Sequence, residues 1–131
     1  MYKLALHSSA KDIDIAELWA TKPIVAAKVV AMLEFIQDDQ NLLDSLTVHD
    51  FGHDQTAAIH VSKWQQFWNR NIDLWRFKIW DLEKLGLQYR VIYFYHLRER
   101  CYYVLAIVHR DFDYDPQHPI TKRILRDCAE F

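Results

Sequence analysis

The chain has 131 residues, the length of one ordinary domain; 51% of them are hydrophobic, and the formal net charge is −2. It contains only two cysteines, and no apolar run approaches the roughly 20 residues that a helix needs to cross a bilayer. These features argue against a disulfide-stapled secreted domain and against a membrane-spanning protein, so we expect one soluble, cytoplasmic domain over residues 1–131.

The N-terminal half predicts a strand followed by two helices. Residues 2–7 have the composition of a short strand, and Ser8 or Ser9 can cap the helix that comes next. Within residues 24–37, apolar side chains recur at helical spacing, directly after a proline that a first helical turn tolerates. Residues 46–50 are a weaker strand candidate. These elements predict an antiparallel helix pair beside a sheet.

The C-terminal half predicts three neighbouring strands. Residues 74–82, 89–97 and 101–109 are rich in aromatic and β-branched side chains, and the short connections between them are typical of antiparallel hairpins. A short capped helix is expected at residues 62–68, inserted between strands, and a terminal helix begins at Pro119. The whole order predicts an α+β domain: an antiparallel sheet of about four strands, with an N-terminal helix pair and a C-terminal helix packed on one side.

Charge is distributed unevenly along the sequence. Residues 1–61 hold four lysines and nine acidic residues, a net of −5, whereas residues 62–131 hold twelve basic and nine acidic residues, a net of +3. We therefore expect any anionic ligand to meet the C-terminal half of the chain.

Basic residues in that half fall at positions that strand geometry can gather. Alternation places Arg76 and Lys78 on one face of their strand, with apolar residues on the other. Antiparallel pairing can bring Arg90, at the start of the next strand, beside His109 and Arg110 at the end of the third. Such a cluster suits a phosphodiester, although charged residues on a strand more often mark an ordinary solvated face.

Three of these segments carry a family resemblance. They are Trp75-Arg76-Phe77-Lys78, Tyr89-Arg90-Val91-Ile92-Tyr93 and the apolar strand that ends in His109-Arg110, followed by a closing helix. In this order they resemble the RelE/ParE superfamily of toxins from type II toxin–antitoxin systems, in its RelE/HigB-like branch. The motifs cover residues 74–126, and over residues 1–45 only the order of elements agrees.

The resemblance implies a RelE-like fold and a toxin that inhibits translation by cutting messenger RNA. Relatives of this branch are metal-independent endoribonucleases, many of which act on the ribosome. In that chemistry the RNA 2′-hydroxyl attacks the adjacent phosphate, which yields a cyclic phosphate and a free 5′-hydroxyl. The resemblance also implies a cognate antitoxin protein as partner and no cofactor.

Residue roles follow from matching the family's motifs. Arg76 and Lys78 match its paired basic strand residues, and Lys78 would bind phosphate or assist proton transfer. Arg90 matches a phosphate-clamping arginine, and Arg110 matches the arginine that stabilises the transition state.

Two further residues complete the predicted site. His109 titrates near neutrality and is therefore the leading general acid or base. Tyr114 would stack on a base or orient the phosphate, as a tyrosine does in several relatives. The predicted catalytic residues are thus Lys78, Arg90, His109, Arg110 and Tyr114, and the predicted RNA-binding residues are Arg76, Lys78 and Arg90.

Histidines upstream of the strands raise the question of a metal site. His49, His53 and His60, with Asp50 and Asp54, are residue types that bind zinc and related ions. Their spacing matches no strong motif, because His49 and His53 would share a face only on a helix, which the intervening glycine interrupts. We therefore predict a loop with ordinary histidines and no metal.

Two other functions stay open for the same fold. A ParE-like toxin would inhibit DNA gyrase without a nuclease site, and a non-catalytic relative would only bind proteins. The basic strand residues and the adjacent histidine favour the ribonuclease. Aromatic residues at 64, 67, 68 and 75 are expected in the core; any that were exposed would be candidates for the antitoxin contact.

Overall fold

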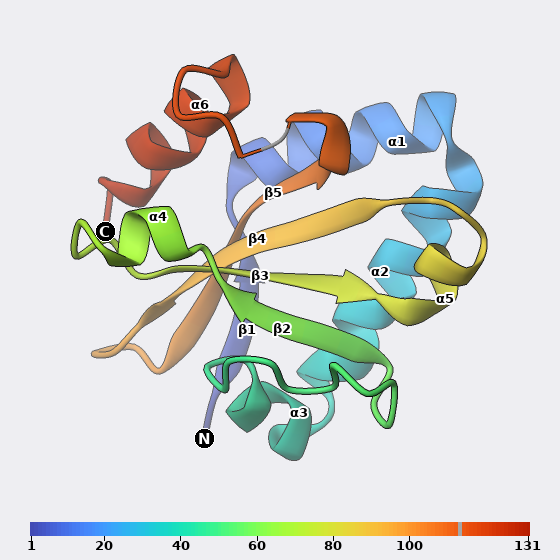
Figure 1. Cartoon of the computed structure of the whole chain (residues 1–131), viewed down its shortest axis with the longest axis horizontal. Coiled ribbons are helices and arrows are strands. Elements are labelled where there is room, and N and C mark those ends of the chain that lie inside the picture. The colour runs from blue at the N-terminus through green and yellow to red at the C-terminus, as the bar shows by residue number, and fades with distance from the viewer. Residues whose placement is uncertain (113) are drawn as a thin grey trace.

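The computed structural model, which describes residues 1–112 and 114–131, confirms the predicted α+β class (Figure 1). It has a five-stranded sheet in the order β1-β5-β4-β3-β2. The strands are β1 (Lys3–Leu6), β2 (Ile59–Lys63), β3 (Leu74–Ile79), β4 (Tyr89–His96) and β5 (Cys101–His109).

Helices fill most of the connections, and the last element of the chain is a helix. The N-terminal group is a π-helical segment η1 (Ala10–Ile15), then α1 (Ala16–Thr21), α2 (Pro23–Gln37) and α3 (Gln40–Ser45). The later helices are α4 (Gln65–Trp68), α5 (Trp80–Lys84), a 3₁₀ turn η2 (Arg110–Phe112) and α6 (Pro119–Cys128). Within the described residues, no helix combines the length and apolar character required of a membrane span.

The sheet is mixed, which corrects the purely antiparallel expectation. β3, β4 and β5 pair antiparallel, as the hairpin-like spacing predicted, and β2 also pairs antiparallel with β3. β1 adds a parallel edge beside β5, with Lys3 opposite Cys101. Parallel pairing needs a crossover connection rather than a hairpin, and here residues 7–100 lie between the two strands.

The second strand lies later in the chain than the sequence suggested. Residues 46–50 form turns instead of a strand, and β2 is Ile59–Lys63, where Ile59 and Val61 alternate into the core. The chain before it runs along the outer edge of β2, because the Asp50 N–H donates to the Val61 carbonyl at 2.8 Å and the Val61 N–H donates to Phe51 at 2.9 Å. The predicted strand 74–82 likewise stops at Ile79, where α5 begins.

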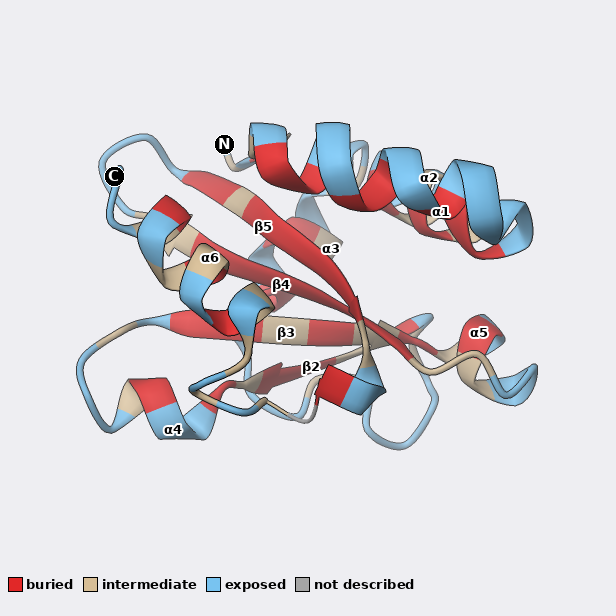
Figure 2. Cartoon of the chain, turned by 90° about the horizontal axis from the view of Figure 1, so that it is seen from above, coloured by how far each residue is buried: buried red, intermediate tan, exposed pale blue. Residues whose placement is uncertain are grey.

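Helices cover both faces of the sheet, and not one face as expected (Figure 2). On one face, the helix pair α1–α2 packs on inward side chains such as Phe77 and Tyr93. On the other face, Ile124 of α6 joins a second cluster with Ile92 and Val108. Neighbouring strand residues therefore pack into two separate hydrophobic clusters, one on each face of the sheet. α6 covers only part of the second face, and the rest of that face carries polar groups.

A buried ion pair joins the two helical layers around the edge of β5. Asp14 in η1 accepts hydrogen bonds from both terminal nitrogens of Arg123 in α6, at 2.9 and 2.7 Å, and from the Ile107 N–H at 2.9 Å. Arg123 also donates to the Leu105 carbonyl at 3.4 Å. Since a buried charge is costly unless it is paired, these bonds hold α6 against η1 and the sheet.

Glutamine side chains cover the free edge of β1. Gln40 accepts a hydrogen bond from the Tyr2 N–H at 3.0 Å and donates to the Tyr2 carbonyl at 3.2 Å, and Gln37 donates to the Leu4 carbonyl at 3.3 Å. Backbone groups that an edge strand would otherwise expose are therefore satisfied from α2 and α3.

Candidate functional site

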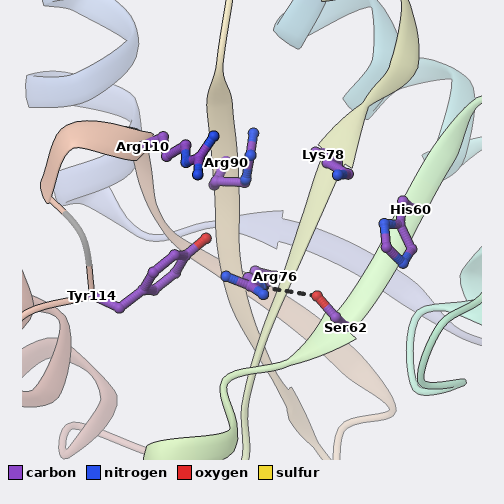
Figure 3. Close-up of a pocket in the computed structure, with 7 residues that line it drawn as sticks. All are labelled: His60, Ser62, Arg76, Lys78, Arg90, Arg110 and Tyr114. Atoms are coloured by element: carbon purple, nitrogen blue, oxygen red, sulfur yellow. Dashed lines mark hydrogen bonds between the residues drawn. The ribbon is translucent and has the colours of Figure 1, made fainter. Parts of the chain in front are cut away.

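A polar hollow opens on the sheet face that carries α6, and its volume of about 340 Å³ falls within the range of small-ligand sites. Side chains from four neighbouring strands or strand ends point into it (Figure 3). The lining consists of His60, Ser62, Arg76, Lys78, Arg90, Arg110 and Tyr114. We call it the basic pocket.

Pairing of β2 with β3 forms one wall of the basic pocket. His60 lies opposite Lys78, and Ser62 lies opposite Arg76, so alternation turns all four side chains to the same face. The Arg76 Nε–H donates to the Ser62 Oγ at 2.8 Å, which fixes the guanidinium plane. The predicted pairing of Arg76 and Lys78 on one face is confirmed.

Arg90 forms the floor of the pocket and is only 8% exposed. Its Nη1 donates to the Tyr89 carbonyl at 3.0 Å and to a carboxylate oxygen of Glu83 in α5. This ion pair explains how a guanidinium tolerates burial, and it neutralises one of the pocket's cations. Sequence reasoning missed Glu83, because the end of the strand at Ile79 and the helical turn that follows were not recognised.

Tyr114 closes the pocket on the side of α6. Its ring lies under the Arg76 guanidinium at 4.4 Å and packs edge-on against Trp64 at 5.0 Å. Its φ of 53° is unusual for a bulky residue and is the kind of strain found at functional sites. The hydroxyl is turned into the pocket, and it is buried without a hydrogen-bond partner in the part of the chain that the structure describes (Figure 3).

The cations of the pocket act on one another. The pKa of Lys78 is lowered from its usual value, first by burial and then by the charge of Arg90, with Arg76 and Arg110 adding to the effect and Glu83 opposing it. A lysine held among three arginines loses proton affinity because the local potential is positive. The same potential attracts a phosphate group.

His109 does not line the basic pocket, so the structure does not bring the predicted acid or base together with the cations. It pairs with Tyr89, packs edge-on against that ring at 5.0 Å, and accepts a hydrogen bond from the Asp111 N–H at 3.1 Å. Tyr89 belongs to the core on the helix-pair face, whereas the next residue, Arg90, faces the pocket. His109 therefore points to the face opposite the pocket, whereas the next residue, Arg110, lines the pocket at the start of the 3₁₀ turn.

His60 is the histidine that lines the pocket, and the sequence assigned it no role in the site. Its ring stacks on Trp80 with an interplanar angle of 2° and a centroid distance of 5.7 Å, and its Nε2 lies 3.3 Å from a carboxylate oxygen of Asp50. The alternation in Ile59-His60-Val61-Ser62 was the available signal for a strand here.

The loop histidines do not converge as a metal site. His49 and His60 each approach Asp50, at 3.6 and 3.3 Å. Among the described residues, the three-ligand cluster is instead His7, Asp127 and Glu130.

In that cluster, both ring nitrogens of His7 already make hydrogen bonds. Nδ1 of His7 accepts from the Ser9 N–H at 3.0 Å, so the ring proton sits on Nε2 and is donated to Glu130 at 2.8 Å. Neither nitrogen of His7 then offers a lone pair to a metal.

The aromatic group around α4 lies mainly in the core, as predicted. Trp64, Phe67 and Trp75 are at most 3% exposed. Trp68 is half-buried, and the ammonium of Lys63 lies over its ring at 4.5 Å.

Comparisons of this chain with protein-family models, with curated proteins and with solved structures found no match. The resemblance to the RelE/ParE superfamily accordingly stays a prediction from the sequence motifs.

Proposed function

We propose that this chain is a metal-independent endoribonuclease that cuts messenger RNA, and the toxin of a type II toxin–antitoxin system. One observation carries the proposal: four cationic side chains line a single open pocket together with a buried tyrosine hydroxyl that has no hydrogen-bond partner among the described residues. Residues that the family resemblance predicted as catalytic or RNA-binding supply five of the seven lining side chains: Arg76, Lys78, Arg90, Arg110 and Tyr114.

The chemistry of the pocket fits a phosphodiester of RNA. Attack by the 2′-hydroxyl places a second negative charge on the phosphate oxygens, and fixed guanidinium groups stabilise that charge most. Arg90 is held rigid by Glu83, while Arg110 is exposed and can approach a bound phosphate. Tyr114 has a free hydroxyl proton for the leaving oxygen.

A cell that makes such an enzyme needs to silence it. A cognate antitoxin that covers the basic pocket, or that withdraws Tyr114 or Arg110 from it, would do so. We place the toxin and its target in the cytoplasm as part of the same proposal.

Purified protein should cut a labelled single-stranded RNA in the presence of EDTA and leave 2′,3′-cyclic phosphate ends. Arg110→Ala should slow cleavage by about 100-fold, the usual effect of removing one transition-state donor. Arg98→Ala is the matched control, because Arg98 is an exposed arginine in the turn between β4 and β5, outside the pocket.

Induced expression in a bacterial host separates the alternatives. Growth arrest with new RNA 5′ ends that depend on Arg110 supports the ribonuclease, even if purified protein cuts only on ribosomes. Growth arrest without RNA cleavage, together with inhibition of purified gyrase, would contradict the proposal and favour a ParE-like toxin. A well-expressed protein that causes no growth arrest and does not inhibit gyrase would instead favour a protein-binding domain.

A further inference from the structure

Metal-free RNA cleavage requires a group that accepts the proton of the 2′-hydroxyl. The described lining of the basic pocket offers guanidinium, ammonium and hydroxyl groups, all poor bases near pH 7, and one imidazole. We propose that His60, oriented by Asp50, is the general base of the reaction. This inference rests on the proposed function, and it replaces the role that the sequence suggested for His109.

The ring of His60 is fixed from two sides. It stacks flat on Trp80, whose Nε1–H donates to the Gly52 carbonyl at 2.9 Å, and its Nε2 faces Asp50 at 3.3 Å. A carboxylate only accepts hydrogen bonds, so the ring proton is on Nε2 and the lone pair is on Nδ1. The Asp50–His60 contact thus sets the tautomer in the way a carboxylate orients a catalytic histidine.

The charges around His60 keep it in the basic form. Asp50 and His53 face it from the loop beside β2, and Lys78 faces it from β3. Burial lowers the pKa of His60 below its usual value of 6.5, Lys78 and His53 act in the same direction, and the hydrogen bond to Asp50 opposes them. At pH 7 the imidazole is therefore mostly neutral and able to accept a proton.

The step balances with Tyr114 as the acid. The 2′-oxygen bonds to the adjacent phosphorus while its proton passes to Nδ1 of His60. The phosphorus–O5′ bond breaks, the leaving oxygen takes the hydroxyl proton of Tyr114, and solvent returns the proton from His60 to the tyrosinate. Figure 3 shows His60 and Tyr114 on opposite sides of the pocket, with Arg76 and Lys78 between them.

Single-turnover cleavage of a labelled RNA that contains every dinucleotide step tests the role, with binding of the all-deoxy oligonucleotide measured in parallel. His60→Ala should cut about 100-fold more slowly and bind the deoxy oligonucleotide within about twofold of wild type. Added imidazole should restore part of the rate to His60→Ala. His96→Ala is the control, a histidine at the end of β4 that lies outside the pocket.

The pH profile separates a base from a structural residue. Wild-type cleavage should fall about tenfold per pH unit once the pH drops below the pKa of His60, because protonation removes the lone pair. That acid limb should vanish in His60→Gln, whose amide can still donate to Asp50 and so maintain the loop. This second variant keeps the test valid if His60→Ala folds poorly.

The inference and the proposed function fail in different ways. Wild-type cleavage with an unchanged rate and acid limb in His60→Gln would overturn the role of His60 and leave the ribonuclease intact. Loss of the acid limb in His109→Ala instead would return the role to His109. A wild-type protein that binds the deoxy oligonucleotide but never cuts RNA, with or without ribosomes, would remove the function and the inference together.

Discussion

Binding of a single-stranded oligonucleotide to the basic pocket should weaken steeply with salt. Four of the described lining residues are cationic, and Glu83 neutralises Arg90, which leaves about three positive charges for phosphate. Each phosphate neutralised on a single strand contributes about −0.7 to the slope of log K against log salt concentration, so we expect a slope of about −2. Affinity should then fall roughly 20-fold between 50 and 200 mM NaCl.

Fluorescence anisotropy with the all-deoxy oligonucleotide measures this slope without cleavage. Glu83→Gln retains a hydrogen-bond acceptor for Arg90 but removes the negative charge, so the slope should steepen to about −2.8 and binding should tighten. Arg110→Ala should flatten it to about −1.4, and Arg98→Ala should leave it unchanged. A wild-type slope near zero, or no change in Glu83→Gln, would refute the view that this pocket holds phosphates.

Three further predictions concern particular contacts. Asp14→Ala removes both Asp14 hydrogen bonds from the partly buried Arg123 guanidinium and leaves it with Asp127 and the Leu105 carbonyl, so the unfolding free energy should fall by about 1–3 kcal/mol in urea titrations; an unchanged value would contradict the burial argument. A Cβ on Gly52 would lie 1.9 Å from the Ile59 carbonyl oxygen, so Gly52→Ala should lower Tm by more than about 5 °C in a thermal scan, and an unshifted Tm would show that the loop relaxes freely. Tyr114→Phe should leave Tm unchanged or higher, because the lost hydroxyl is unpaired, while RNA cleavage falls at least about tenfold; destabilisation would reveal a hidden bond to that hydroxyl.

The parts of the site that sequence could predict are those governed by short-range geometry. Alternation within one strand put Arg76 and Lys78 on a shared face, and the tight connection before β5 placed Arg90 near Arg110. These inferences need only the period of a strand and the antiparallel sense of a hairpin.

The sequence could not predict features that depend on which strands pair and on how the helices pack. The placement of His109 is not among them, because strand alternation alone turns His109 away from the face of Val108 and Arg110. His60 became visible only once β2 was known to pair with β3, since its partner Lys78 lies 18 positions later in the chain. The side of the sheet chosen by α6 is set by which apolar cluster it completes, and its own pattern fits either face.

The covered sheet edges limit how a partner protein can recognise this domain. Adding a strand to β1 would break the bonds made by Gln37 and Gln40, and adding one to β2 would displace the chain at Asp50 and Phe51. A tight inhibitor should therefore bind side chains on the faces of the molecule rather than a sheet edge. The basic pocket is the surface whose charge best complements a carboxylate-rich segment.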